Sequence, residues 1–133
     1  MKYFSVAEAE ALIPDLERIF EAILEIAAKA EAKAENIRRL SEDEQRHVPE
    51  LAIEKSQLQF MANGMNEWFQ KIAELGALPK GLDPALVDFP HRLGGQDVVL
   101  CWKLGDKKIT HYHGVDEGFS GRKALPRSQR SAS

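Results

Sequence analysis

Two long series of apolar residues, separated by a short polar segment, constrain the fold of this chain more than any other feature. In each series the seam positions recur at alternating intervals of four and three residues. The first series is Leu12, Leu16, Ile19, Ile23, Ile26, Ala30, Ile37 and Leu40, and the second is Leu51, Leu58, Met61, Met65, Trp68, Ile72 and Leu75. This spacing is typical of a coiled-coil-like contact between helices. Because the segment 41–47 between them is short and polar, residues 1–76 are predicted to form a long antiparallel helical hairpin.

Each series carries one charged residue on its seam, Lys33 in the first and Glu54 in the second. If the chain folds back so that Ile37 faces Leu51, Lys33 faces Glu54. We therefore predict a structural ion pair between Lys33 and Glu54. Removing one of the two charges should destabilise the fold more than replacing both residues with apolar ones. The alternative is that the two side chains extend separately into solvent.

Local signals mark the ends of the predicted helices. Ser5 and Glu8 have the spacing of a capping box, which begins a helix. Pro14 cannot donate to the carbonyl of Glu10, so we expect a kink there, or a short helix running into a second one. Gly76 follows the second apolar series directly and suits a helix C-cap.

The chain after Gly76 has the composition of turns and strands. Residues 78–84 are predicted to be a turn-rich linker, and residues 86–89 a short extended segment closed by Pro90. Residues 98–102 and 109–113, separated by a turn at 105–107, are predicted to form a β-hairpin. The expected fold is therefore α+β, a long helical hairpin followed by a small β-hairpin or antiparallel sheet.

The expected domain organisation is a single domain, residues 1–122, with the helical hairpin at 1–76 and the β-rich part at 77–122. Residues 123–133 contain Pro, Ser, Arg and Gln with little to bury, and are expected to be a flexible tail. A length of 133 residues is enough for one buried core.

Charge and cysteine content narrow the function classes. The net charge of -3 argues against a nucleic-acid partner, because phosphate binding relies on clustered Lys and Arg. The single cysteine, Cys101, excludes an internal disulfide framework and suits a reducing compartment. Neither a signal segment nor an apolar run of about 20 residues is visible, so we expect a cytoplasmic protein without a membrane span.

The predicted hairpin also favours a homodimer. A helix over residues 15–40 would be roughly 39 Å long at 1.5 Å per residue, whereas a compact globule of this size is about 36 Å across. A further apolar row lies beside the first seam: Ile13, Phe20, Leu24, Ala27 and Ala34. A second copy of the hairpin would cover it in a four-helix bundle. The alternative is a monomer whose C-terminal part folds over the row.

Histidines in the β-rich part are the first candidate for chemistry. His111 and His113 alternate on a predicted strand, so both imidazoles would lie on one face. Such a pair could bind a divalent zinc, iron or nickel ion, with Asp88, Asp116 or Glu117 completing the site. The alternative is one exposed histidine and one held by hydrogen bonds in a polar pocket.

A small-molecule pocket near the β-hairpin is the second candidate. Its predicted residues supply an apolar wall, an acid/base pair and a guanidinium: Asp88, Trp102, His113, Glu117 and Arg122. In the alternative, Asp88 caps a turn, Trp102 belongs to the core, and Arg122 pairs with Glu117 to fix a loop. Cys101 is interpreted as a small buried hydrophobe, since no basic residue is placed to lower its pKa.

The sequence resembles the bacterial family known as domain of unknown function 2203. The matching residues are Tyr3-Phe4-Ser5-Val6-Ala7-Glu8-Ala9, Leu12-Ile13-Pro14, Gly81-Leu82, Leu86-Val87-Asp88-Phe89-Pro90, Leu100-Cys101-Trp102, Leu104-Gly105, Tyr112-His113 and Gly118-Phe119-Ser120-Gly121-Arg122. The resemblance implies a helical part with a small β part, and no established activity. Tyr112 stands where family members carry Trp.

Two hypotheses of function follow. The first is a dimeric helical-hairpin module for interaction or ligand binding, with a polar pocket near the β-hairpin. The second is a small metal-dependent or acid/base enzyme centred on His113. A transcription-linked role through helical contacts is a third, which the acidic charge does not favour. The sequence identifies neither a substrate nor a metal.

Overall fold

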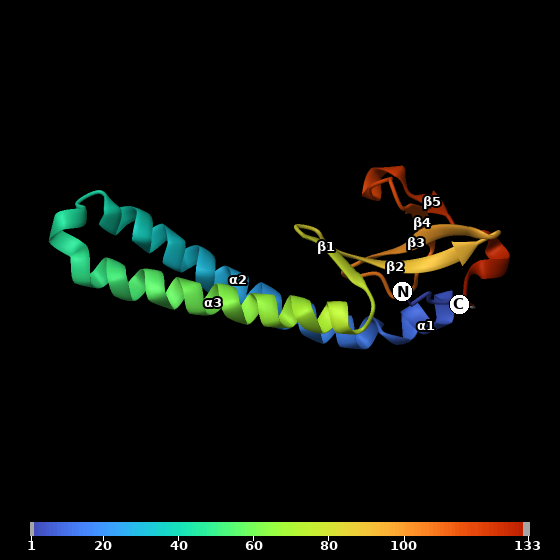
Figure 1. Cartoon of the computed structure of the whole chain (residues 1–133), viewed down its shortest axis with the longest axis horizontal. Helices are drawn as coiled ribbons and strands as arrows, with labels where there is room; N and C mark the ends of the chain where they lie inside the picture. Colours follow the sequence, from blue (N-terminus) through green and yellow to red (C-terminus); the bar gives the residue numbers. More distant parts are fainter. Residues whose placement is uncertain (1, 132–133) are drawn as a thin grey trace. The chain divides into compact units, whose positions relative to one another are not determined.

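The computed structural model describes residues 2–131 (Figure 1). Its helices are α1 (Val6–Ala11), α2 (Ile13–Ser41) and α3 (Val48–Glu74), with short 3-10 turns η1 (Glu44–His47), η2 (Phe119–Gly121) and η3 (Arg127–Gln129). Its strands are β1 (Leu78–Leu82), β2 (Ala85–Leu93), β3 (Gln96–Lys103), β4 (His111–Gly114) and β5 (Lys123–Ala124). The predicted α+β class, long helices followed by an antiparallel sheet, is confirmed.

The chain forms two compact units. One consists of Glu21–Gln70, and the other combines the segment up to Phe20 with the segment from Lys71 onward. The division runs through both long helices rather than after Gly76, because Leu16 and Phe20 near the start of α2, and Ile72 near the end of α3, are fully buried in the unit that contains the sheet.

The predicted helix ends are present. The Ser5 hydroxyl oxygen accepts from the Glu8 amide at 3.0 Å, and the Glu8 carboxylate accepts from the Ser5 amide at 2.9 Å, which is a capping box. The short helix α1 runs into α2, and Pro14 lies in the first turn of α2, where an amide would have no helical acceptor. After α3, Gly76 adopts a φ of +93°, as the predicted C-cap requires.

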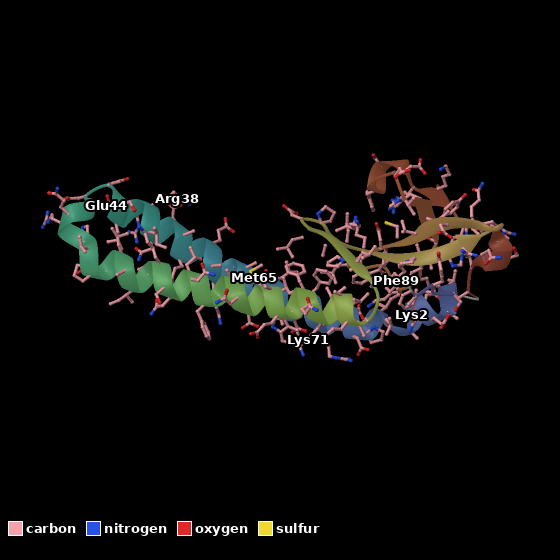
Figure 2. The ribbon with its side chains drawn as sticks, viewed as in Figure 1. Lys2, Arg38, Glu44, Met65, Lys71 and Phe89 are labelled. Atoms are coloured by element: carbon pink, nitrogen blue, oxygen red, sulfur yellow. The ribbon has the colours of Figure 1, made fainter. Side chains whose placement is uncertain are left out.

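The unit Glu21–Gln70 is an antiparallel pair of helical segments (Figure 1). Lys33 Nζ lies 3.3 Å from the Glu54 carboxylate, and both side chains are 19% exposed. The amide of Asn36 also donates to Glu54 at 3.1 Å. The two charged seam residues therefore face each other, while Arg38 and Glu44 mark the end of the hairpin where the chain turns (Figure 2).

The sheet is larger than the sequence indicated. Its five antiparallel strands follow chain order, β1-β2-β3-β4-β5, so the predicted linker at 78–84 contains an edge strand. Strand β2 also continues through Pro90 instead of ending there. The Pro90 carbonyl accepts from the Phe4 amide at 2.7 Å, so the side of Pro90 that lacks an N–H faces the N-terminal segment and not β3.

The two faces of the sheet differ. Val87, Phe89, Leu100 and Trp102 alternate along β2 and β3 and are fully buried on one face. Phe89 contacts Phe4 edge-on at 5.1 Å between ring centroids, and Trp102 lies 6.0 Å from the ring of Phe20. This face is the core of the unit, and the labelled Phe89 lies within it (Figure 2).

The predicted tail begins inside the sheet. Lys123 and Ala124 pair with β4, and Leu125 is only 1% exposed because its amide donates to the Thr110 carbonyl and its side chain is enclosed. The flexibility of the residues that follow stays a prediction, and residues 132–133 of that tail lie outside the described residues. Between residues 2 and 131, no helix combines the length and apolar character needed to cross a membrane.

Candidate functional site

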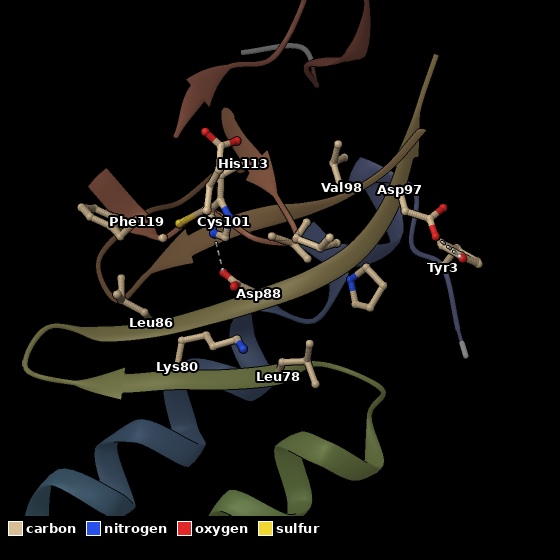
Figure 3. A pocket seen from close by; sticks show the side chains of 15 residues that line it. Tyr3, Leu78, Lys80, Leu86, Asp88, Asp97, Val98, Cys101, His113 and Phe119 are labelled. Atoms are coloured by element: carbon tan, nitrogen blue, oxygen red, sulfur yellow. Dashed lines mark hydrogen bonds and ion pairs between the residues drawn. The ribbon is translucent and has the colours of Figure 1, made fainter. Parts of the chain in front are cut away.

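Three strands bring Asp88, Cys101 and His113 onto the face of the sheet opposite the core. Asp88 on β2 pairs directly with Cys101 on β3, and His113 on β4 pairs with Val99, two residues from Cys101. Residues that pair directly, and residues two apart on a strand, share a face. The three residues are 4%, 3% and 4% exposed. The His113 ring and the Asp88 carboxylate point toward each other, with Cys101 beside them (Figure 3).

The imidazole of His113 is held in one orientation. Its Nδ1 lies 2.8 Å from the Gly114 carbonyl, which can only accept, so Nδ1 carries the proton of that bond. Its Nε2 lies 3.4 Å from Asp88 Oδ1. The Cys101 sulfur joins these two atoms in a cluster whose members all lie within 4.8 Å of one another.

Burial favours the neutral forms of Asp88 and Cys101. It raises the pKa of the Asp88 carboxyl, and the charges of His113 and Lys80 offset only part of that shift. Burial, together with the nearby Asp88 charge, raises the pKa of the Cys101 thiol to about 11. The thiol is therefore protonated at neutral pH unless a cation stabilises its thiolate form.

A pocket of about 540 Å³ opens over the cluster (Figure 3). That volume is in the range that encloses small organic ligands. Most of the walls are apolar side chains from the sheet and from the loop after β4, and a few polar groups lie among them. The residues that line the pocket are Tyr3, Leu78, Lys80, Leu86, Asp88, Pro90, Asp97, Val98, Val99, Cys101, His113, Val115, Glu117, Gly118 and Phe119.

Glu117 fixes the loop that follows β4, the strand that carries His113. Its Oε1 accepts from the Gly114 amide at 2.7 Å and from Lys123 Nζ at 2.9 Å. The hydrogen bond from Lys123, followed by that from Gly114, lowers the pKa of the Glu117 carboxyl. A Cβ on Gly114 would lie only 2.9 Å from Oε1, so a larger residue there would displace the Glu117 carboxylate. Glu117 thus orients Gly114, whose carbonyl orients His113.

Three of the five residues predicted for the pocket line it, and two do not. Asp88, His113 and Glu117 line the pocket. Trp102 does not, because strand alternation places it on the core face, where its indole N–H donates to the Asp106 carbonyl at 2.9 Å. Arg122 does not line the pocket either; its guanidinium lies over the Phe119 ring at 4.3 Å.

The predicted metal ligands are also only partly together. Asp88 and His113 are adjacent, but His111 Nδ1 is hydrogen-bonded to Thr110 Oγ1 at 2.8 Å and is not in the cluster. Burial, followed by the charges of Arg122 and Arg130, lowers the pKa of His111. Glu117 lies outside the cluster, and its Oε1 accepts from Gly114 and Lys123. Among residues 2–131, the group that gathers three candidate ligands is Asp88, Cys101 and His113.

Cys101 is the site residue that sequence reasoning missed. The signal that places it was present in Gly94-Gly95, which have φ of +59° and +79° and form a two-residue hairpin turn. Such a turn pairs Leu93 with Gln96, and counting back along both strands pairs Asp88 with Cys101. The register of β3 with β4 depends on a longer connection, so His113 could not be placed in the same way.

Comparison with known proteins gives a family and no activity. A search of curated proteins and a search of solved structures each found no match. A family model described as "Uncharacterized conserved protein (DUF2203)" matches residues 2–125, which include both helical segments, the sheet and the whole cluster. This chain therefore belongs to the DUF2203 family.

Proposed function

We propose that this chain is a ligand-binding module that holds a small molecule in the pocket over Asp88 and His113. One observation carries the proposal: a carboxyl and an imidazole, both buried and 3.4 Å apart, form the floor of a pocket of about 540 Å³. Asp88 and His113 contact each other, and His113 Nδ1 is bonded to the Gly114 carbonyl. A carboxyl group has further lone pairs, so Asp88 can also bind a polar group of a ligand in the pocket.

The lining favours a ligand with an apolar body and one polar group. Leu78, Leu86 and Val99 offer apolar walls to the body. Asp88 and His113 can together donate and accept hydrogen bonds, which suits a carboxylic acid, an amide or a phenol at the deep end. Lys80 adds a positive charge on β1, the strand next to that of Asp88, and this charge acts on the Asp88 carboxyl (Figure 3).

Acid/base catalysis centred on His113 is the alternative function. Its specific support is that Nδ1 is occupied by the Gly114 carbonyl, which leaves Nε2 for proton exchange beside Asp88. A catalyst would convert the bound molecule, whereas a binding module would release it unchanged. Turnover of a bound probe therefore distinguishes the two.

The binding proposal is tested by nuclear magnetic resonance on the uniformly ¹⁵N-labelled full chain. The probes are carboxylic acids, amides and phenols that carry an aliphatic or aromatic body. We expect some of them to shift the backbone amides of Val99, His113 and Phe119, and to lose affinity in His113→Gln but not in His111→Gln. Shifts confined to other regions, or equal affinity in both variants, would overturn the proposal.

We also propose that the chain forms a homodimer through its helical hairpin. Ile53 and Phe60 on α3 are 58% and 78% exposed and lie two turns apart on one face of the helix. Phe20, which belonged to the apolar row predicted for the dimer, is fully buried beside Trp102, so only the later part of that row needs a partner.

The remaining predictions about cellular context also stay proposals. We propose a cytoplasmic protein, since its one thiol is buried and suits a reducing compartment. The net charge of -3 favours a small molecule or a protein over a nucleic acid as the partner.

A further inference from the structure

We propose that Asp88, Cys101 and His113 form a zinc site with one coordination position open to the pocket. The inference rests on the proposed function, because the open position is where the polar group of the small molecule would bind. The three residues supply one oxygen, one sulfur and one nitrogen, all buried and all on one face of the sheet.

The spacing of the donor atoms fits tetrahedral zinc. With bonds of about 2.0–2.2 Å to oxygen and nitrogen, two such ligands on a tetrahedron lie about 3.4 Å apart. His113 Nε2 and Asp88 Oδ1 are 3.4 Å apart. The Cys101 sulfur lies within 4.8 Å of one ligand atom of each of the other two residues, and zinc binding would draw it to the longer bond of about 2.3 Å that sulfur makes.

The histidine is prepared for coordination. Metal-bound imidazoles almost always donate their other N–H to a carbonyl or a carboxylate, which fixes the ring and the tautomer. His113 Nδ1 makes that bond to Gly114, whose own amide is held by Glu117. His113 Nε2 therefore faces Asp88 Oδ1, and a zinc ion between these two atoms would take the place of the proton that they otherwise share.

Charge balance also selects a divalent cation. A carboxylate and a thiolate bring two negative charges, and a zinc ion bound by them and by a neutral imidazole gives a neutral cluster. A neutral cluster costs far less to bury than an isolated carboxylate does. A mixed sulfur, nitrogen and oxygen set suits zinc and disfavours calcium or magnesium, which prefer oxygen ligands alone.

The number of protein ligands gives the site its character. Structural zinc sites have four protein ligands, whereas sites that act on a substrate have three and leave the fourth position to water or substrate. Neither His111 nor Glu117 belongs to the group formed by Asp88, Cys101 and His113. His111 Nδ1 is bonded to Thr110, and Glu117 Oε1 is bonded to Gly114 and Lys123. The fourth position would face the pocket.

The test uses the full chain, purified without a histidine tag and freed of metal with a chelator. Zinc is titrated by calorimetry, and cobalt(II), which takes the same geometry, by absorption spectroscopy. We expect one ion per chain, a thiolate-to-cobalt charge-transfer band and the intense visible bands of tetrahedral cobalt. Cys101→Ser should abolish the thiolate band, and Asp88→Asn and His113→Gln should each lower zinc affinity more than about tenfold.

Two matched variants serve as controls. His111→Gln removes the neighbouring histidine, and Asp97→Asn removes a carboxylate that lines the same pocket but lies outside the cluster. Both should bind zinc like the unaltered chain. Amide spectra of every variant establish that the sheet is folded. Absence of binding, or binding that survives in all three ligand variants, would overturn the zinc site.

The open position has its own readout. Azide or imidazole added to the cobalt form should change the visible bands, whereas an unchanged spectrum would contradict a free coordination position. The zinc titration and the organic-probe experiment can fail independently of each other. If zinc fails to bind while the organic probes still depend on His113, only the zinc inference fails. If zinc binds and the probes bind to neither form, only the binding proposal fails.

Discussion

His113 Nε2 and Asp88 Oδ1 lie 3.4 Å apart although their strands, β4 and β2, are separated by the whole width of β3. Neighbouring strands are about 4.8 Å apart, so the two side chains must lean toward each other over the middle strand. The residue of β3 beneath this contact is Cys101, which pairs with Asp88. The Cys101 thiol therefore lies next to the carboxyl–imidazole contact, and three strands each contribute one residue to the cluster.

Replacing Gly114 with alanine should disturb the cluster from outside it. The new Cβ would lie 2.9 Å from Glu117 Oε1, so the end of this side chain must move and its hydrogen bond to the Gly114 amide is weakened. Loss of one such hydrogen bond costs about 0.5–1.5 kcal/mol of unfolding free energy. Chemical denaturation measures that loss, and the ¹⁵N shifts of the His113 ring report its altered tautomer.

Gly118→Ala is the matched control, since nothing lies within 4 Å of a Cβ built there and its φ of -103° suits any residue. It should change the unfolding free energy by less than about 0.5 kcal/mol. Equal effects of the two substitutions would show that the contact with Glu117 does not hold the loop.

Lys33→Met should lower the melting temperature more than the double change Lys33→Met with Glu54→Met. The single change leaves the Glu54 carboxylate half-buried on the seam without its cation, while the double change replaces both charges with apolar side chains. Thermal unfolding followed by circular dichroism measures both variants. A double variant that melts at or below the single variant would show that the pair does not matter for the hairpin.

Acid should weaken the hairpin through Glu54. The hydrogen bond from Asn36, and then the contact with Lys33, lower the pKa of Glu54 in the folded chain. Because the pKa of Glu54 is lower in the folded chain than in the unfolded chain, its ionised form stabilises the fold. This stabilisation is complete above the pKa of the unfolded chain, about 4.5, and is lost as the pH falls through the pKa of the folded chain. The melting-temperature difference between the unaltered chain and Glu54→Gln should thus be largest near neutral pH and shrink below about pH 4. A difference that is constant with pH would contradict this assignment.

Phe60→Glu should convert a dimer to a monomer if the hairpin face is the interface. Phe60 is 78% exposed, so the substitution places a charge on the apolar face without disturbing a core. Light scattering coupled to size-exclusion chromatography gives the mass, with Gln59→Glu on a neighbouring position as the control. A chain that is monomeric before the substitution would refute the dimer outright.

The helical part was predictable because its determinants are local. Spacing alone placed the hairpin, and the two residues that interrupt the apolar pattern, Lys33 and Glu54, identified which positions face each other. The capping box at Ser5 and the C-cap at Gly76 needed only neighbouring residues. Such signals do not depend on the rest of the fold.

The sheet and the site were predicted less well because they depend on distant partners. Pro90 was predicted to end a strand, but the strand continues, and the amide of Phe4, far away in the sequence, donates to the Pro90 carbonyl on the side away from β3. Trp102 was predicted to line the pocket. It is the residue after Cys101 on β3, and successive residues of a strand point to opposite faces, so it lies on the core face. From the sequence alone, a cysteine next to a tryptophan in an apolar strand is interpreted as a core residue. The register of three strands is needed to place it beside Asp88 and His113.

An X-ray structure of crystals grown with zinc, measured on both sides of the zinc absorption edge, tests the central claim most directly. We expect one strong anomalous difference peak per chain, within bonding distance of Asp88, Cys101 and His113, with its fourth ligand lying in the pocket. A peak at other residues, or no peak in this cluster from crystals that contain zinc, would contradict the account of the site.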